Sequence, residues 1–228
     1  MTKTQKHFVV IDPAVRVSEV DTYNRIVRDE GIRATYHMPA LTGQHTMCPE
    51  LNVLDKITGV LVFGSSSSVN DNLAWQFPLR EWLEKAIDKK IPVLGFCFGH
   101  QLLAHIFGSK VGYARADEQK NFGFQTVTMW ANPLSNNKTI EGNVFVSHKE
   151  EVKSIPSGWE LIASREECQI EGLKHKTLPL FSMQSHPEAT IEFLKNQSTP
   201  YTYPVQESDF HFGYTIINAF VNFCNKPG

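Results

Sequence analysis

The residues best suited to chemistry are a cysteine between two glycines and a histidine followed by proline and glutamate. Cys97 is the centre of GFCFG (95–99), and His186 opens the tripeptide His-Pro-Glu that ends at Glu188. A cysteine nucleophile needs a base within hydrogen-bond reach, and that base needs a group that fixes its tautomer. These residue types predict nucleophilic catalysis with Cys97 as nucleophile, His186 as base and Glu188 as orienting carboxylate.

The elements around Cys97 resemble a nucleophile elbow. A short apolar run predicts a buried strand over Ile91–Phe96, and apolar spacing predicts a helix over His100–Phe107 closed by Gly108. Glycines two residues before and after the nucleophile let strand and helix pass closely. The helix N-terminus favours the thiolate form of Cys97. The alternative is a buried structural cysteine.

A second segment is expected at the same edge of the sheet. Gly59–Phe63 (GVLVF) predicts a buried strand, and the small residues GSSSSV (64–69) follow it directly. Backbone N–H groups of such a turn can form an oxyanion hole at the carboxyl edge of a parallel sheet. A flexible serine loop is the alternative.

Spacing connects Glu188 to His186. Two residues along an extended chain return a side chain to the same face, and Pro187 favours an extended His186. Glu188 is therefore expected to reach back to the imidazole. The chain has nine histidines, so a chance histidine at a strand end is the alternative.

The order of elements predicts one α/β domain over residues 1–228. The first half alternates strands with helices, which predicts a mainly parallel open sheet with helices on both faces. Its other expected strands are His7–Asp12 and Ile32–Met38, and Leu51–Ile57 is expected to be a short helix. Two longer helices are also expected, one capped by Ser18 and ended by Gly31 with Val20 inward, and one opened by Pro78. The second half predicts a small antiparallel extension and a closing helix. The strands expected there are Lys110–Tyr113, Phe122–Trp130, Val144–Ser147, Glu160–Ala163, Cys168–Leu173 and Leu178–Gln184, and the helix is Phe210–Asn225.

Composition narrows the function classes. The 228 residues are 41% hydrophobic and 20% charged, with a net charge of −2, which gives no electrostatic case for nucleic acid or a membrane surface. No apolar run is long enough for a membrane span, and no signal region is recognised. The four cysteines are scattered, which predicts neither a zinc site nor a disulfide framework and fits a reducing cytoplasm. His45 and Cys48 are interpreted as loop residues, not as metal ligands.

The two motifs together resemble a known family. GFCFGHQLLA with SMQSHPEA is similar to class I glutamine amidotransferases, the Cys-His-Glu triad type, and the resemblance covers most of the chain. Ile57–Val69 resembles the strand and oxyanion loop of that family. Lys120–Val127 and Val146–Val152 resemble segments of the glutaminase domain of GMP synthase and its stand-alone relatives.

The resemblance implies roles for further residues. Backbone N–H groups of Phe98 and of Ser65, beside Gly64, would form the oxyanion hole. Gln101 would lie in the substrate pocket. His148 would lie near the amino-acid end of the substrate, with a structural role as the alternative. No metal or organic cofactor is implied.

Three features depart from the family pattern. The oxyanion loop is usually Ser-Gly-Gly-Pro or Ser-Gly-Ser-Pro, and here it is Phe-Gly-Ser-Ser (63–66). The residue before the histidine is commonly Phe or Gly, and here it is Ser185. Lys195–His211 separates the His-Pro-Glu motif from the last helix and carries three aromatic residues, so we expect it to cover the active site or form a partner surface.

Three functions are compatible with these residues. The first is a glutaminase that releases ammonia for a separate synthetase or acceptor subunit, because no Walker-type loop or dinucleotide motif is present in the chain. The second is a stand-alone γ-glutamyl peptidase or hydrolase. The third is a degenerate binding or regulatory subunit, which the altered loop at Phe63–Ser68 favours and the intact Cys, His and Glu disfavour.

Overall fold

The structure, a computed structural model, describes residues 6–43 and 51–226. Within them, nine strands form one sheet in the order β2-β1-β3-β4-β11-β10-β9-β6-β7, and β5 and β8 form a separate pair. The strands are β1 (His7–Ile11), β2 (Ala34–His37), β3 (Ile57–Val62), β4 (Val93–Phe96), β5 (Val111–Tyr113), β6 (Asn121–Met129), β7 (Ile140–His148), β8 (Glu150–Val152), β9 (Trp159–Arg165), β10 (Cys168–His175) and β11 (Leu180–Met183).

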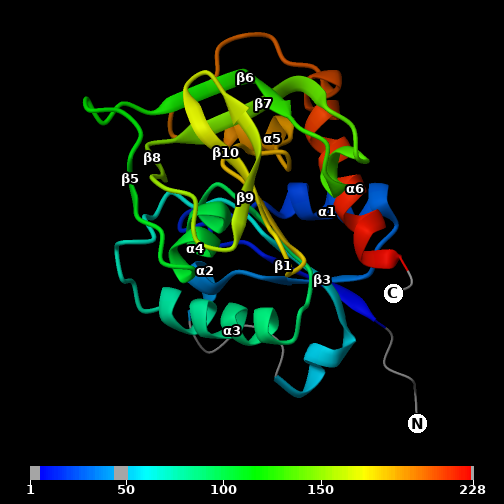
Figure 1. The fold of residues 1–228 in the computed structure, drawn as a ribbon. Helices are drawn as coiled ribbons and strands as arrows, with labels where there is room; N and C mark the ends of the chain where they lie inside the picture. The colour runs from blue at the N-terminus through cyan, green and yellow to red at the C-terminus, as the bar shows by residue number, and fades with distance from the viewer. Residues whose placement is uncertain (1–5, 44–50, 227–228) are drawn as a thin grey trace.

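Helices connect and cover these strands (Figure 1). The α-helices are α1 (Val20–Glu30), α2 (Pro39–Thr42), α3 (Gln76–Asp88), α4 (Phe98–Ile106), α5 (Ile191–Lys195) and α6 (His211–Asn225). Short 3-10 helices are η2 (Leu51–Lys56), η3 (Pro133–Ser135) and η4 (Glu207–Phe210).

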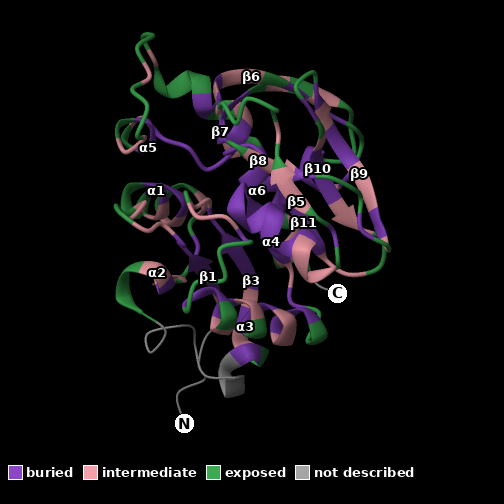
Figure 2. Ribbon diagram, turned by 90° about the vertical axis from the view of Figure 1, so that its left-hand side faces the viewer, coloured by how far each residue is buried: buried purple, intermediate pink, exposed green. Residues whose placement is uncertain are grey.

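Alternating side chains of the parallel strands enter two different cores. In β1, Val9 and Ile11 pack with α3 and α4, whereas Phe8 and Val10 pack with α1 and α6. This period of two is expected of strands that are buried on both faces. Figure 2 shows the buried colour continuing through β1 and β3 between the two helical layers. The prediction of a mainly parallel α/β sheet with helices on both faces is therefore confirmed.

The antiparallel part continues the same sheet. β11 pairs in parallel with β4 on one side and antiparallel with β10 on the other, so it joins the two halves. β9, β6 and β7 follow by antiparallel pairing. The predicted antiparallel extension is present, and it places the segment that follows β11 beside the end of β4.

The expected start of α1 is wrong. Ser18 does not cap the helix, because Glu19 occupies the cap position and its N–H donates to Asp12 Oδ2 at 2.7 Å. Asp12, at the end of β1, therefore fixes where the helix begins. Val20, expected to face inward, is 41% exposed. Gly31 ends the helix with a left-handed φ of 61°, as expected.

Two other helices begin earlier than predicted. α3 begins at Gln76, so Pro78 lies inside its first turn, where the missing N–H would have no intrahelical partner. α4 begins at Phe98, directly after Cys97, where His100 was expected. β8 and the 3-10 helices η3 and η4 were not predicted, because elements of three or four residues carry no measurable periodicity.

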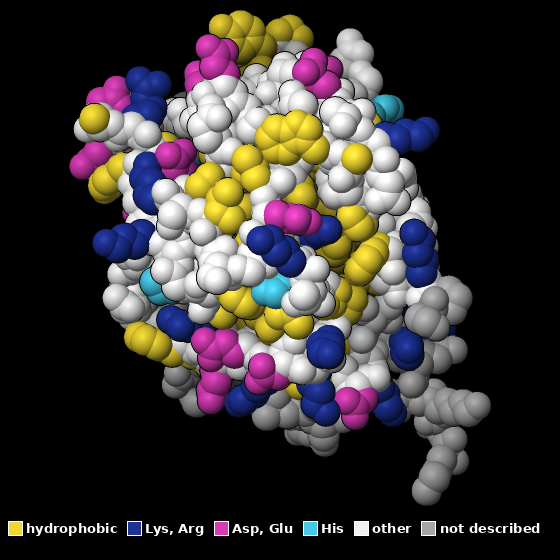
Figure 3. Space-filling model, viewed as in Figure 1, with side chains coloured by type: hydrophobic (Ala, Val, Ile, Leu, Met, Phe, Trp, Pro, Cys, Tyr) yellow, Lys and Arg dark blue, Asp and Glu magenta, His cyan; other side chains and the backbone are white. Residues whose placement is uncertain are grey.

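No helix among the described residues is long and apolar enough to cross a membrane. Within the same ranges, no group of three or more His, Cys, Asp or Glu side chains is arranged to hold a metal ion. The interpretation of His45 and Cys48 as loop residues concerns positions outside the described residues. On the face of Figure 3, acidic and basic side chains are interspersed.

Candidate active site

Cys97 occupies a sharp turn between β4 and α4. Its φ of 47° and ψ of −100° lie outside the regions that side chains with a Cβ usually adopt, which is the strained geometry of a nucleophile elbow. A Cβ at Gly95 would lie 2.5 Å from the backbone of Gly99, and a Cβ at Gly99 would lie 2.4 Å from the carbonyl oxygen of Val62. Both glycines are therefore required by close backbone approach.

His186 lies after β11, the strand that neighbours β4 on the side away from β3. β11 pairs with β4, and the chain continues beyond Met183 to His186, whose N–H donates to the Phe145 carbonyl at 2.8 Å. Nδ1 of His186 lies 2.9 Å from Oε1 of Glu188, and both side chains are buried. The predicted contact is present, but the route is a turn, since Ala189 N donates to His186 O at 3.1 Å. The expected extended path from His186 to Glu188 is therefore wrong.

The charge state of His186 is set by its neighbours. Burial alone would lower the pKa of the imidazole, but the negative charges of the Glu188 carboxylate and of Cys97 outweigh burial and raise it. Nε2 of His186 is buried and makes no hydrogen bond that meets standard geometry. Cys97 nevertheless acts electrostatically on the imidazole. Catalytic hydrogen bonds are often loose before substrate binds. The imidazole is also held by Phe193, whose ring centroid lies 4.7 Å away.

The loop after β3 lies against this pair. A Cβ at Gly64 would lie 2.5 Å from Cε1 of His186 and 3.4 Å from Cβ of Cys97. The serine hydroxyl that follows anchors the loop, since Ser65 Oγ donates to Pro13 O at 2.7 Å and accepts from Ser67 N at 3.1 Å. These bonds fix the loop without the proline of the family pattern.

Two backbone N–H groups are available beside Cys97. Phe98 is the first residue of α4, where an N–H has no intrahelical partner, and Ser65 N belongs to the anchored loop. In the described part of the chain, neither N–H donates to another protein group. The structure thus leaves the two expected oxyanion donors unpaired.

Gln101 and His148 line the same cavity, and both side chains are hydrogen-bonded to other groups of the chain. Gln101 Nε2 donates to Glu150 O at 2.8 Å and to Gln184 Oε1 at 3.2 Å. Both ring nitrogens of His148 are engaged, Nδ1 with Glu150 O and Nε2 with Arg165. Burial, with help from the Arg165 charge, lowers the pKa of His148 to about 3. This arrangement favours a structural role for His148.

An acidic pair beside Glu188 was not anticipated from the sequence. Asp12 is fully buried and accepts from Tyr36 Oη at 2.5 Å and from Ala14 N at 2.9 Å. Burial, and then the charge of Asp12, raises the pKa of Glu19 to about 8. Asn196 Nδ2 donates to Glu19 Oε2 at 3.3 Å. The one feature of the sequence that could have indicated this pair is the position of Asp12 at the carboxyl end of a buried strand.

A buried ion pair supports the segment that carries His186. Arg165 Nε lies 2.8 Å from Glu171 Oε2, and the two side chains are 1% and 0% exposed. The other oxygen of Glu171, Oε1, accepts from Ser185 N at 2.9 Å. The pair therefore fixes the backbone next to His186. The alternation of apolar and polar residues along β9 and β10 does not predict this pair, because Arg and Glu side chains are usually exposed.

A cavity of about 780 Å³ lies beside Cys97 and His186. Its lining includes Gly64, Cys97 and His186, together with residues 14–17 after β1, Lys120, and residues 196–199 after α5. The beginning of Lys195–His211 thus forms a wall of the cavity. Tyr201 and Phe210 of this segment pack with Phe124, while Tyr203 is exposed.

The family model described as class I glutamine amidotransferase matches residues 21–198. The chain belongs to the class I glutamine amidotransferase family. The expected resemblance is thereby confirmed, and the matched region contains Cys97, His186 and Glu188. In this family member, the elbow at Cys97 follows β4, and the segment that carries His186 follows the adjacent strand β11.

Relatives of this family member include proteins named as subunits of GMP synthase. The chain is 41% identical over 120 residues to a protein of Methanocaldococcus jannaschii that is named as one subunit of glutamine-hydrolyzing GMP synthase, covering 50% of this chain and 62% of that one. It is 31% identical over 156 residues to the protein of the same name from Methanopyrus kandleri, covering 66% and 76%. The chain thus spans less than two thirds of the first of these relatives. A glutamine amido transferase structure from Methylobacillus flagellatus shares the fold, with a TM-score of 0.75, 17% identity and coverage of 99% and 98%.

Proposed function

We propose that this chain hydrolyses the side-chain amide of glutamine to glutamate and ammonia through a thioester on Cys97. The observation that carries the proposal is the arrangement of Cys97 at a strained elbow, beside a buried His186 whose Nδ1 is bonded to Glu188. Membership of the glutamine amidotransferase family supports the choice of substrate.

The proposed reaction uses groups of the chain alone. The thiol proton of Cys97 passes to Nε2 of His186, and the resulting thiolate Sγ, paired with the imidazolium, attacks the side-chain carbonyl carbon of glutamine. The N–H groups of Phe98 and Ser65 stabilise the oxyanion. When the C–N bond breaks, His186 returns the proton to the nitrogen, which leaves as ammonia. His186 then takes a proton from water, water attacks the thioester, and glutamate leaves as the thiol is restored.

The unpaired N–H groups weigh against a degenerate, non-catalytic subunit. That alternative rested on the altered loop at residues 63–68, and the loop is anchored by the Ser65 hydroxyl. Relatives named as subunits of GMP synthase support a proposal that the ammonia passes to a separate synthetase subunit. The proposed substrate is glutamine, with no nucleic acid or membrane partner.

A second candidate is hydrolysis of larger γ-glutamyl amides by the same chemistry. The cavity of about 780 Å³ favours it, since a cavity in this range accommodates ligands considerably larger than glutamine. Only the leaving amine would differ between the two reactions.

The test is glutamate release by the purified chain from glutamine and from a panel of γ-glutamyl peptides, with Cys97→Ala as the blank. Release that depends on Cys97 supports the proposal, and the preferred substrate decides between the two candidates. Release at equal rates by both proteins would overturn it. If neither the wild-type chain nor Cys97→Ala releases glutamate, failure of a glutamine-analogue electrophile to label Cys97 would also overturn the proposal.

A further inference from the structure

Three basic residues from three separate segments line the cavity over Cys97. Arg16 follows β1, Lys120 precedes β6 and Lys149 lies between β7 and β8. Lys120 is partly buried, while Arg16 and Lys149 are exposed. Burial lowers the pKa of Lys120, the charge of Cys97 opposes this effect, and the charges of Lys149 and Arg16 lower it further. The three cations and Cys97 are therefore electrostatic neighbours.

In the part of the chain that the structure describes, these three cations have no carboxylate partner. Among residues 6–43 and 51–226, no salt bridge involves Arg16, Lys120 or Lys149. Acidic residues do line the cavity, namely Glu19, Asp71 and Glu150, but none of them pairs with the three cations. Gathering like charges around a cavity is unfavourable unless an anion offsets it. The cluster is therefore suited to an anionic part of the ligand.

The position of Lys120 indicates which part of the ligand this is. Lys120 Nζ lies 3.5 Å from Gln197 Oε1, and Gln197 Nε2 donates to Phe193 O at 3.2 Å. Phe193 packs on the imidazole of His186. Gln197 and Phe193 thus link Lys120 to the side of the cavity that packs on His186. In the proposed mechanism His186 protonates the leaving nitrogen, so the amine part of the substrate lies toward this wall.

Resting on the second candidate of the proposed function, we propose that Arg16, Lys120 and Lys149 form a leaving-group subsite for a carboxylate on the amine part of a γ-glutamyl amide. The substrate class is then γ-glutamyl amino acids and short γ-glutamyl peptides with a free C-terminal carboxylate. Lys120 supplies the partly buried cation, and the two exposed residues add charge at the cavity mouth.

The experiment compares two substrates that differ only in this charge, γ-glutamylglycine and γ-glutamylglycinamide. The measured quantity is the ratio of kcat/KM for the acid to kcat/KM for the amide. We expect the wild-type chain to prefer the acid by about tenfold or more, as one charge-assisted contact can provide. In Lys120→Met the ratio is expected to fall to about one, and in Arg16→Gln it is expected to fall about threefold.

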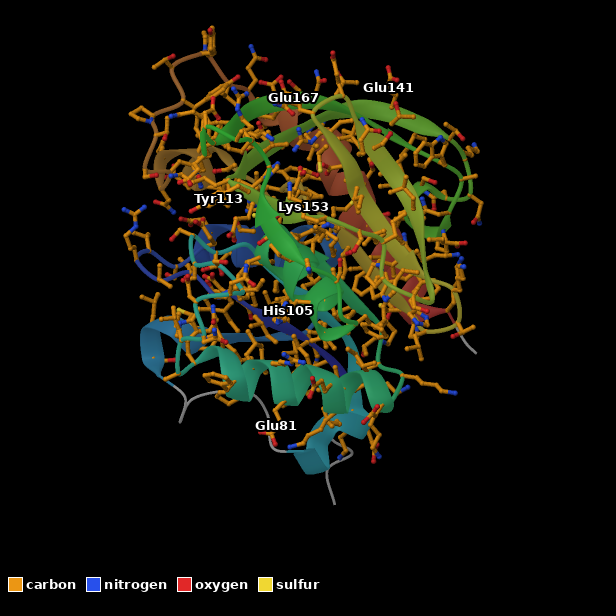
Figure 4. The ribbon with its side chains drawn as sticks, turned by 60° about the vertical axis from the view of Figure 1, so that its left-hand side comes forward. Glu81, His105, Tyr113, Glu141, Lys153 and Glu167 are labelled. Atoms are coloured by element: carbon orange, nitrogen blue, oxygen red, sulfur yellow. The ribbon has the colours of Figure 1, made fainter. Side chains whose placement is uncertain are left out.

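Lys153→Met is the matched control. Lys153, labelled in Figure 4, follows β8 and lies outside the cavity lining. Its Nζ lies 2.8 Å from Oε1 of Glu151. Its ratio is expected to equal the wild-type value. Since both substrates are measured on each variant, a partly unfolded variant loses both rates and leaves the ratio interpretable.

Several results would overturn the subsite. One is a ratio near one in the wild-type chain, and another is an unchanged ratio in both Lys120→Met and Arg16→Gln. A third is a loss of kcat/KM for glutamine itself as large as the loss for γ-glutamylglycine, because the cations would then bind the glutamyl half. Cys97-dependent hydrolysis of glutamine with none of either γ-glutamyl compound would overturn the subsite alone. Absence of Cys97-dependent hydrolysis and of Cys97 labelling would overturn the proposed function.

Discussion

Nδ1 of His186 lies 2.9 Å from Oε1 of Glu188, and the turn from His186 to Ala189 holds the two side chains together. The carboxylate fixes which ring nitrogen faces Cys97 and stabilises the protonated imidazole. The same contact is a main reason why the pKa of His186 is raised in spite of burial.

Replacing Glu188 with Gln tests this contact. Without the carboxylate, the pKa of His186 loses its largest raising contribution and falls. The imidazolium that pairs with the Cys97 thiolate is then lost at lower pH, so the alkaline limb of the pH–rate profile moves to lower pH. We expect kcat/KM for glutamine to drop by about a hundredfold to ten-thousandfold. Profiles between about pH 6 and 10 would measure both effects. An unchanged alkaline limb would contradict the effect of Glu188 on the pKa of His186, and an unchanged kcat/KM would contradict the orienting role.

Gly64→Ala tests how tightly the loop after β3 lies on the site. The added Cβ would meet Cε1 of His186 at 2.5 Å, so either the imidazole or the loop has to move. We expect kcat/KM to fall by about tenfold or more, as small misplacements at a reacting centre do.

The matched control for that variant is Gly112→Ala. A Cβ at Gly112 would meet only Lys153 Cε at 3.8 Å, which is ordinary contact. Its activity is expected to remain within about twofold of wild type. Equal losses in the two variants would show that the effect of Gly64→Ala is not local to His186.

The sequence predicts the parts of this site whose geometry is local. Glycines around Cys97 indicate a close strand–helix crossing, and the structure places Gly95 against the backbone of Gly99. The Arg165–Glu171 pair could not be predicted in this way, because it depends on the packing of β9 against β10. The hydrogen bond from Glu19 N to Asp12 Oδ2 was missed for a similar reason, since the two residues lie seven positions apart in the chain.

Arg165→Met tests the buried pair behind His186. Removing the guanidinium leaves Glu171 buried and without its cation, and we expect the free energy of unfolding to fall by about 3–5 kcal/mol. Arg80→Met is the control, because the Arg80–Glu84 pair is about 42% and 44% exposed. Its cost is expected to be about 0.3–0.5 kcal/mol. Urea unfolding of both variants measures the difference, and equal costs would contradict a supporting role for the buried pair.

A buried histidine next to the elbow predicts acid sensitivity. Burial lowers the pKa of His100 to about 3, so the folded state holds it neutral. As the pH falls below about 6.5, the unfolded chain binds a proton there that the folded chain does not, and stability is lost. Between about pH 4.5 and 6, His100→Gln should reduce the slope of unfolding free energy against pH by about 1.4 kcal/mol per pH unit. An unchanged slope would show that His100 titrates normally in the folded protein.

The most direct test of Cys97 as the nucleophile is the mass of the intact chain after incubation with a glutamine-like chloroketone, followed by peptide mapping. Burial raises the pKa of Cys168 and Cys224, which makes these two thiols internal controls. We expect one added group, located on Cys97, and loss of glutamate release in proportion to labelling. Labelling of Cys168 or Cys224 in place of Cys97, or full activity after Cys97 is labelled, would contradict this role of Cys97.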